Sequence, residues 1–188
     1  MTTLSWPTLE QLWQRRAAWR IRRAHIGDRA AMQSFVEEGL GATTRRLRFH
    51  GAIKACSTRL ASALVEGEAV WAAFDDRALI GEARFVRDEA DPERAEMAIA
   101  VADRWQGRGL GAALLGTVLA QAQRAGVRRL LADVMCGNTR MQRFVQRHGF
   151  APLLHWRGGD TQLYECQLAA PQDAWLGPLA ALYRRLKR

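Results

Sequence analysis

Three alternate glycines, Gly107, Gly109 and Gly111, follow an apolar segment and open a strongly helical one. Glycine lacks a Cβ atom, so a backbone that contains it can turn sharply and lie close to a ligand. The first N–H groups of a helix have no partner within the helix, and they lie at the positive end of its dipole. The sequence therefore predicts an anion-binding corner between a strand and a helix, which suits a diphosphate.

The spacing of these glycines excludes two common phosphate loops. The pattern Gly-x-Gly-x-Gly is one residue short of the dinucleotide fingerprint Gly-x-Gly-x-x-Gly, and no Gly-Lys-Ser/Thr follows, as a P-loop requires. A different ligand that carries a pyrophosphate is indicated.

Hydrophobic periodicity predicts an alternating order of strands and helices, and hence an α/β (α+β) fold. The apolar residues Leu110, Leu114, Val118 and Ala122 recur every four positions along the helix that the glycines open. We expect strands over 19–26, 69–75, 78–87, 94–101, 129–135, 151–157 and 161–168. We expect helices after a cap at Gly27-Asp28, over 43–65 with a break near Gly51, and over 109–126 and 138–148.

The length of 188 residues predicts one domain, here 19–168, with an extension at each end. Residues 1–18 contain a capping box, Thr8 to Gln11, and are expected to form a short helical extension. Residues 169–188 combine an apolar stripe with basic residues and are expected to form an amphipathic helix. That helix would either dock on an acidic partner or membrane surface, or pack on its own domain or a dimer mate.

The net charge is +9, and nearly all the basic residues are arginines spread along the chain. A solvated surface explains this spread, and a positive field would also steer a polyanionic cofactor. No aromatic-basic platform indicates specific nucleic-acid binding. We expect a cytoplasmic protein without a transmembrane segment, and its three widely spaced cysteines predict neither a disulfide framework nor a metal site.

The segment from Glu96 to Ala112 resembles the acetyl-CoA signature of the GNAT N-acetyltransferases. Its pattern, Gln/Arg-x-x-Gly-x-Gly/Ala, reads here Gln106-Gly107-Arg108-Gly109-Leu110-Gly111. The resemblance continues through Asn138–Phe144 and His148-Gly149-Phe150. Upstream, Ile26–Asp28 and Leu40–Phe49 are similar to the catalytic domain of bacterial Pat-type protein lysine acetyltransferases. The resemblance implies the GNAT fold, with a mixed, twisted sheet of six to seven strands flanked by about four helices.

The resemblance also implies acetyl-CoA as cosubstrate. The end of the strand at Ile99 and Val101 would splay from its neighbour, pair with the pantetheine arm and stabilise the oxyanion of the reacting carbonyl. Asn138 would contact the cofactor arm, and a plain helix N-cap is the alternative reading of that residue. The residues expected to hold the pyrophosphate are Gln106, Gly107, Arg108, Gly109, Leu110, Gly111 and Ala112.

Glu96 is the expected general base, because it matches the position of the catalytic glutamate in Pat-like domains. A lysine with a pKa of about 10.4 is only about one part in a thousand neutral at pH 7.4, so a base is valuable. A surface glutamate at the strand edge is the alternative reading, and a shift of one residue in register would move the side chain to the other face. Glu82 and Glu93 are weaker candidates. Val145 occupies the position where many GNAT enzymes have a tyrosine general acid, so no general acid is assigned.

The leading hypothesis is an acetyl-CoA-dependent N-acetyltransferase that transfers by direct attack to a primary amine, with a protein lysine as acceptor. A small amine, such as a polyamine or an antibiotic, is the first alternative. A noncatalytic acyl-CoA sensor is the second. Acetyl versus longer acyl donors and a homodimer remain open.

Overall fold

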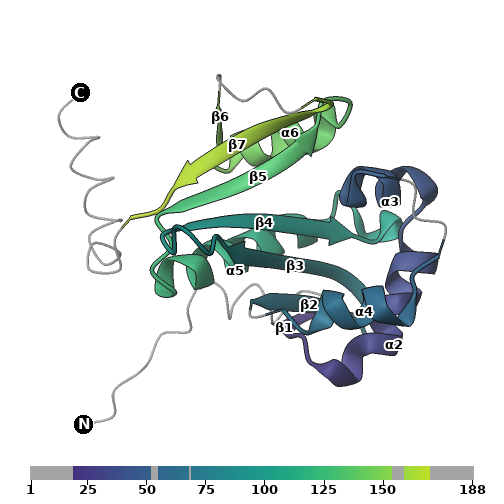
Figure 1. The fold of residues 1–188 in the computed structure, drawn as a ribbon. Helices are drawn as coiled ribbons and strands as arrows, with labels where there is room; N and C mark the ends of the chain where they lie inside the picture. Colours follow the sequence, from purple (N-terminus) through teal and green to yellow (C-terminus); the bar gives the residue numbers. More distant parts are fainter. Residues whose placement is uncertain (1–18, 52–54, 68, 154–158, 170–188) are drawn as a thin grey trace, which may run out of the picture.

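The computed structural model describes residues 19–51, 55–67, 69–153 and 159–169. Within them, seven strands form one mixed sheet, and five α-helices flank it (Figure 1). The expected fold is confirmed, with five helices rather than about four. The expected helical extension over 1–18 and nearly all of the expected C-terminal helix over 169–188 lie outside the described residues.

The sheet has the order β1-β2-β3-β4-β5-β7-β6. All neighbouring strands are antiparallel except β4 and β5, which are parallel. The strands are β1 (Arg20–Arg23), β2 (Val70–Phe74), β3 (Leu79–Arg87), β4 (Arg94–Val101), β5 (Arg129–Met135), β6 (Ala151–Pro152) and β7 (Thr161–Gln167). The helices are α2 (Arg29–Ser34), α3 (Ala42–Phe49), α4 (Thr58–Val65), α5 (Leu110–Arg124) and α6 (Thr139–Arg147).

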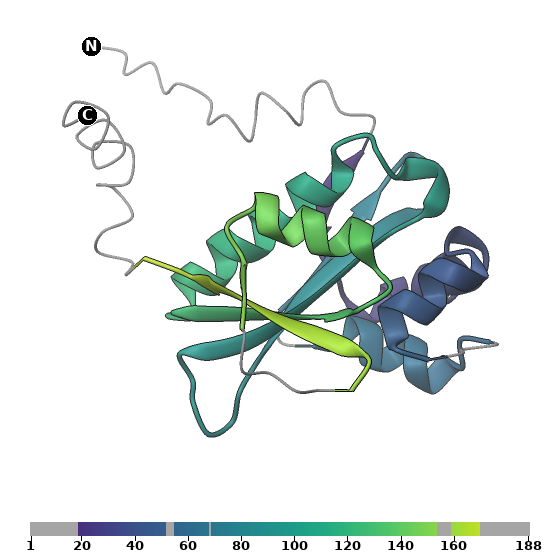
Figure 2. The ribbon, with the colours of Figure 1, turned by 90° about the horizontal axis from the view of Figure 1, so that it is seen from above.

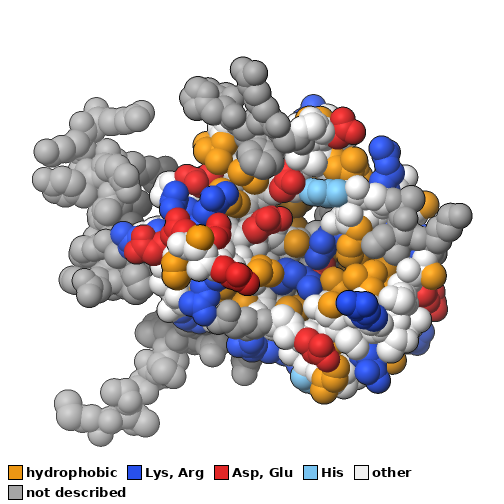
Figure 3. All heavy atoms as spheres, in the orientation of Figure 1, with side chains coloured by type: hydrophobic (Ala, Val, Ile, Leu, Met, Phe, Trp, Pro, Cys, Tyr) orange, Lys and Arg blue, Asp and Glu red, His pale blue; other side chains and the backbone are white. Residues whose placement is uncertain are grey.

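The sheet has an apolar core on each face. Helices α5 and α6 cover one face, and α2 to α4 lie on the other side (Figure 2). The predicted stripe of α5 is buried as expected, since Leu110, Leu114, Val118 and Ala122 are all 0% exposed. The smaller core contains Met32, Phe35, Val36 and Leu64, packed beneath α2 and α4. Basic and acidic side chains are interspersed on the face shown in Figure 3.

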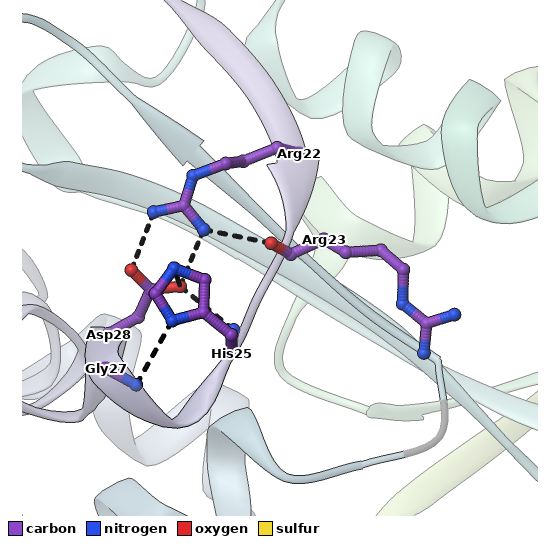
Figure 4. Close-up of polar contacts among 5 residues, drawn as sticks. All are labelled: Arg22, Arg23, His25, Gly27 and Asp28. Atoms are coloured by element: carbon purple, nitrogen blue, oxygen red, sulfur yellow. Dashed lines mark hydrogen bonds and ion pairs between the residues drawn. The ribbon is translucent and has the colours of Figure 1, made fainter.

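The start of the first helical region differs from the prediction. His25 rather than Asp28 caps a short 3-10 turn at Ile26–Asp28, because its Nδ1 accepts a hydrogen bond from the Gly27 N–H at 3.1 Å. Asp28 is the third residue of that turn, so its carboxylate reaches back to the His25 N–H at 3.0 Å (Figure 4). Two nitrogens of the Arg22 guanidinium also donate to it, at 2.6 and 2.7 Å. These bonds from Arg22 lower the pKa of Asp28, against the opposing effect of burial.

The parallel strands β4 and β5 separate along their length, as Figure 1 shows. They pair only from Arg94 with Arg129 to Glu96 with Leu131, although β4 continues to Val101 and β5 to Met135. Beyond Glu96, the β5-facing edge of β4 therefore has backbone groups without a strand partner. This opening in the sheet positions the candidate site.

Candidate functional site

A pocket of about 960 Å³ occupies the opening between β4 and β5. The end of α3, the loop between β4 and α5, and the start of α6 complete its walls. Nine of the predicted site residues line it, namely Glu96, Ile99, Val101, Gln106, Gly107, Gly109, Gly111, Ala112 and Asn138. The fold thus brings together a set of residues that spans more than forty positions of the sequence.

The glycine corner has the backbone conformation that the sequence predicts. Gly107 and Gly109 have φ angles of +76° and +87°, a region that side-chain-bearing residues rarely adopt. No side chain caps the N-terminus of α5, which begins at Leu110. The N–H groups of its first turn are therefore available to an anion that enters the pocket.

Gln106 holds the corner together through its side chain. Its Nε2 donates to the Val101 carbonyl at 3.1 Å and to Asp103 Oδ1 at 3.0 Å, while Arg140 of α6 donates to its Oε1. The same Asp103 oxygen accepts a hydrogen bond from Thr44 of α3 at 2.7 Å. One polar network therefore joins the strand end, the loop, α6 and α3 around the pocket.

Two predicted residues do not line the pocket with their side chains. The Leu110 side chain is 0% exposed and belongs to the core beneath α5. The Arg108 guanidinium carbon lies 5.3 Å from the centroid of the Trp105 ring. The backbone N–H groups of both residues and the exposed Arg108 side chain remain as candidate contacts to an anion.

Asn138 lies at the pocket and also caps α6. Its Oδ1 accepts a hydrogen bond from the Met141 N–H at 3.1 Å, so the N-cap reading is correct. The cap uses only the oxygen of the side chain. Within the described part of the chain, the Nδ2 group has no hydrogen-bond acceptor, and it can serve a ligand.

Glu96 lies at the last paired position before β4 and β5 separate. It is exposed, and within the described ranges its carboxylate has no ion-pair partner. It lines both the main pocket and a second hollow of about 440 Å³ that shares Arg48, Phe49, Met97 and Ala98 with it. A carboxylate placed in this way can receive a proton from a group that enters from either hollow.

The two weaker candidates for the base lie elsewhere. Glu82 is 2% exposed and forms ion pairs with Arg48 at 2.7 Å and Arg84 at 2.9 Å. Burial would raise the pKa of Glu82, but the charges and hydrogen bonds of the two arginines outweigh it and lower that pKa. Glu82 therefore belongs to a buried ion cluster with Arg48 and Arg84, and it is not free to act as a base. Glu93, in the loop before β4, lines neither hollow.

Two residues that the sequence reading missed, Asp133 and His50, also line the pocket. Asp133 Oδ2 lies 3.8 Å from His50 Nδ1, at the C-terminal end of α3. Asp133 carried a weak signal, because it alternates with the buried residues Leu130, Ala132 and Val134 and so must face away from them. His50 carried none, because only the tertiary fold brings the end of α3 over β5.

The structure offers little for a general acid. Val145, at the position of the expected tyrosine, is 0% exposed, and Tyr164 lies buried in the core. His148 lines the pocket, but its Nδ1 lies 2.8 Å from the Phe144 carbonyl and its ring packs on the Phe144 ring.

Among the residues described, no group of three or more acidic, His or Cys side chains could hold a metal ion, and no helix could cross a membrane.

Comparisons with known proteins give a family and a fold for this chain. The family model "Acetyltransferase (GNAT) family" matches residues 47–150. Acetyltransferase Pat of Mycolicibacterium smegmatis is 39% identical over 71 residues, which are 38% of this chain and 21% of that protein. The match thus spans about a fifth of the relative's length.

Solved structures share the fold. The GNAT domain of S. lividans PAT superposes with a TM-score of 0.75 at 24% identity, over 80% of this chain and 90% of that one. The structure of yncA from Salmonella typhimurium with its cofactor acetyl-CoA gives a TM-score of 0.63 at 22% identity, over 81% and 95% of the two chains.

Proposed function

Because this chain belongs to the GNAT acetyltransferase family, we propose that it transfers an acetyl group from acetyl-CoA to the side-chain amine of a protein lysine. One observation carries the proposal: β4 and β5 separate at Glu96, and the glycine corner lies at the far end of the same strand. A carboxylate and an anion-binding backbone thus face one pocket.

The pocket provides a suitable surface for each part of acetyl-CoA. The loop from Gln106 to Gly109 and the first turn of α5 would bind the pyrophosphate through backbone N–H groups. The edge of β4 at Ile99–Val101 has lost β5 as a partner, so its backbone groups can pair with the amide groups of the pantetheine arm. The N–H groups of that edge would also stabilise the oxyanion that forms at the acetyl carbonyl.

Glu96 would act as general base in a direct transfer. The acceptor nitrogen attacks the thioester carbonyl carbon, the proton of the amine passes to the Glu96 carboxylate, and the C–S bond breaks to release the CoA thiolate. A positioned base typically contributes about 10²- to 10⁴-fold to such a step. No side chain is assigned to protonate the departing thiolate.

Two observations favour a protein acceptor over a small amine. The second hollow continues from Glu96 along the sheet and includes Val86, whose exposed fraction of 62% is unusual for a large apolar residue. Such a groove suits a segment of polypeptide on either side of a lysine. The relative of M. smegmatis is named acetyltransferase Pat, the type whose catalytic domain this sequence resembles.

Acetylation of a native cytosolic extract tests this function. Wild-type protein, Glu96→Gln and the control Glu93→Gln would each be incubated with acetyl-CoA and the extract, and new acetyl-lysines mapped by mass spectrometry. We expect the wild type and the control to produce new acetyl-lysines that Glu96→Gln does not.

Other outcomes would redirect the assignment. Turnover of a small amine without protein acetylation would identify a small-molecule acetyltransferase. Saturable acetyl-CoA binding without transfer to any acceptor, unchanged in Glu96→Gln, would identify a sensor.

A further inference from the structure

We propose that Asp103 is a positioning residue that links the glycine corner to α3, so that acetyl-CoA bound at the corner fixes the wall against which the acceptor amine binds. This inference rests on the proposed acetyl transfer and deepens it, because it names the residue through which the donor half of the pocket sets the geometry of the acceptor half. Asp103 lines neither hollow, so it acts through the groups that it binds.

Asp103 is joined closely to the glycine corner. It begins the short 3-10 turn Asp103–Trp105, which follows the end of β4 and leads into the corner at Gln106. The Gln106 N–H donates to the Asp103 backbone carbonyl at 3.2 Å, and the Gln106 Nε2 donates to Asp103 Oδ1 at 3.0 Å. A pyrophosphate held by the backbone of the corner would therefore also restrict the turn that carries Asp103.

The same carboxylate holds the start of α3. Its Oδ1 accepts a hydrogen bond from Thr44 Oγ1 at 2.7 Å, and its Oδ2 accepts one from the Gly41 N–H at 3.1 Å. Gly41 is the N-cap residue of α3 and has no side chain with which to cap the helix. A negative charge at this end of a helix is also favoured by the helix dipole. Asp103 thus takes the place of a capping side chain from a distant part of the sequence.

The start of α3 depends on this attachment more than its end does. Phe49, which packs against the smaller core, is the last residue of the helix, and Arg45 and Arg48 attach its middle and its end. Thr43 is exposed, yet it lines the main pocket together with Thr44. Figure 1 shows α3 beside the end of β4, where the turn with Asp103 begins. The contacts of Asp103 therefore set the position of this part of the wall.

Two substitutions would break the attachment in different ways. Both carboxylate oxygens of Asp103 accept hydrogen bonds, so in Asp103→Asn the amide NH₂ group would face a donor in either orientation. Gly41→Ala keeps the aspartate, but a Cβ atom at Gly41 would lie 2.6 Å from Asp103 Oδ2, so the carboxylate would have to move. Gly41 has a φ of −64°, which alanine adopts without strain.

Amide hydrogen exchange tests the link without any acceptor. Exchange over residues 42–49 would be followed by mass spectrometry in the wild type, Asp103→Asn, Gly41→Ala and the control Asp76→Asn, each free and saturated with acetyl-CoA. Asp76 is exposed in the turn between β2 and β3 and lines neither hollow, so its substitution removes the same charge away from the site. Unchanged exchange over β5 would verify that each variant is folded.

We expect acetyl-CoA to slow the exchange of α3 about three- to tenfold in the wild type and the control, as the added stability of about one hydrogen bond predicts. Asp103→Asn and Gly41→Ala should lose this slowing. Both should still bind acetyl-CoA within about threefold of the wild-type affinity, because the backbone N–H groups of the corner remain. In transfer to a lysine peptide, both variants should raise the KM for the acceptor more than they lower kcat.

A wild type in which acetyl-CoA leaves the exchange of α3 unchanged would overturn the proposal. So would protection of α3 that persists in both variants, because direct contact with the ligand would then hold the helix. An unchanged KM for the acceptor in both variants would also contradict it. Failure of the proposed function looks different, since the wild type would then show protection of α3 that depends on Asp103 but transfer no acetyl group to the peptide.

Discussion

The glycines of the β4–α5 corner have two different physical requirements. Gly107 and Gly109 adopt positive φ angles, and a Cβ atom at either would meet no atom within 4 Å. Their requirement is the backbone conformation itself. Gly111 has no such φ, and a Cβ there would lie 3.8 Å from the Phe144 ring, an ordinary contact. If the pyrophosphate binds here as proposed, the requirement for glycine at this position comes from the ligand rather than from the fold.

Alanine substitutions should separate these requirements. We expect Gly109→Ala to lower the free energy of unfolding by about 1–2 kcal/mol, because a side-chain-bearing residue is strained in the left-handed region. Gly111→Ala should unfold at nearly the wild-type urea concentration but bind acetyl-CoA about tenfold more weakly, because its methyl group would occupy the pocket against the pyrophosphate. Urea unfolding and calorimetric titration would measure both. Unchanged acetyl-CoA affinity in Gly111→Ala would contradict the placement of the pyrophosphate.

Side chains in the site were predictable to very different degrees. The glycine corner is a local pattern, so its residues could be found from spacing alone. Glu82 and Glu96 lie on the same face of adjacent strands, and only the positions of Arg48 and Arg84 distinguish a buried ion cluster from an available base. Asp28 was predicted to cap a helix, but its carboxylate accepts hydrogen bonds from Arg22 on β1. That contact depends on the angle between the strand and the turn, which no local pattern encodes.

Helix α3 forms one wall of the pocket, yet none of its residues is fully buried. Polar contacts hold α3 against the rest of the domain. Arg48 pairs with Glu82, Thr44 donates to Asp103, and Arg45 donates to the Glu37 carbonyl at 3.0 Å. The position of this wall therefore depends on these hydrogen bonds and ion pairs together with Phe49, which is partly buried against the smaller core.

Substitution of Glu82 should destabilise the protein strongly. In Glu82→Gln, Arg48 and Arg84 would keep their charges in a largely buried cluster without a counter-ion. Loss of one partner from such a cluster typically costs about 3–5 kcal/mol. Urea unfolding would measure the change, with Glu89→Gln, at an exposed loop position, as the control. A loss of less than about 1 kcal/mol would show that the cluster contributes little to stability.

Elements with strong periodicity were predicted almost to the residue. Strand β5 and the apolar stripe of α5 match the expectation, because each has one face fully buried. The expected strand over 19–26 shortens to Arg20–Arg23, because the His25 cap begins a 3-10 turn directly after it. Of the expected strand over 151–157, Ala151–Pro152 is a strand, and residues 154–158 lie outside the described part.

The free energy of unfolding should decrease at acidic pH because of Asp28 and Glu82, the two buried carboxylates among the described residues. The pKa values of Asp28 and Glu82 are lowered in the folded state, so each stabilises the fold above its unfolded pKa, about 3.9 for Asp and 4.3 for Glu. That contribution is lost as the pH falls through the lower, folded pKa. We expect stability to change little between about pH 7 and pH 5 from this source, and to decrease below about pH 4.

The variant Asp28→Asn isolates one of these contributions. Near pH 7 the variant should have a lower free energy of unfolding than the wild type. This difference should become smaller as the pH falls below about 4, because Asp28 of the wild type is then protonated and also uncharged. Urea unfolding of both proteins over this range would measure it. A deficit that stays constant with pH would show that the charge of Asp28 is not the source of its contribution.

The whole site combines a half that is local in sequence with a half that is not. The half proposed to bind acetyl-CoA consists of one strand, one loop and the start of one helix, so a local motif was enough to predict it. The other half of the pocket needs α3 to lie over the opening between β4 and β5, which brings His50 beside Asp133 across more than eighty residues of sequence. No periodicity or spacing encodes that contact, so it became visible only in the folded chain.

The central claim is that Glu96 removes the proton of the attacking amine. Acetyl transfer to a lysine peptide, measured for the wild type, Glu96→Gln and Glu93→Gln from about pH 7 to pH 10, tests it most directly. We expect Glu96→Gln to lower kcat by about 10²- to 10⁴-fold near pH 7, and the deficit to narrow toward the lysine pKa of about 10.4, where the amine loses its proton to solvent. Full activity of Glu96→Gln near pH 7, or a deficit that is the same at every pH, would contradict the claim.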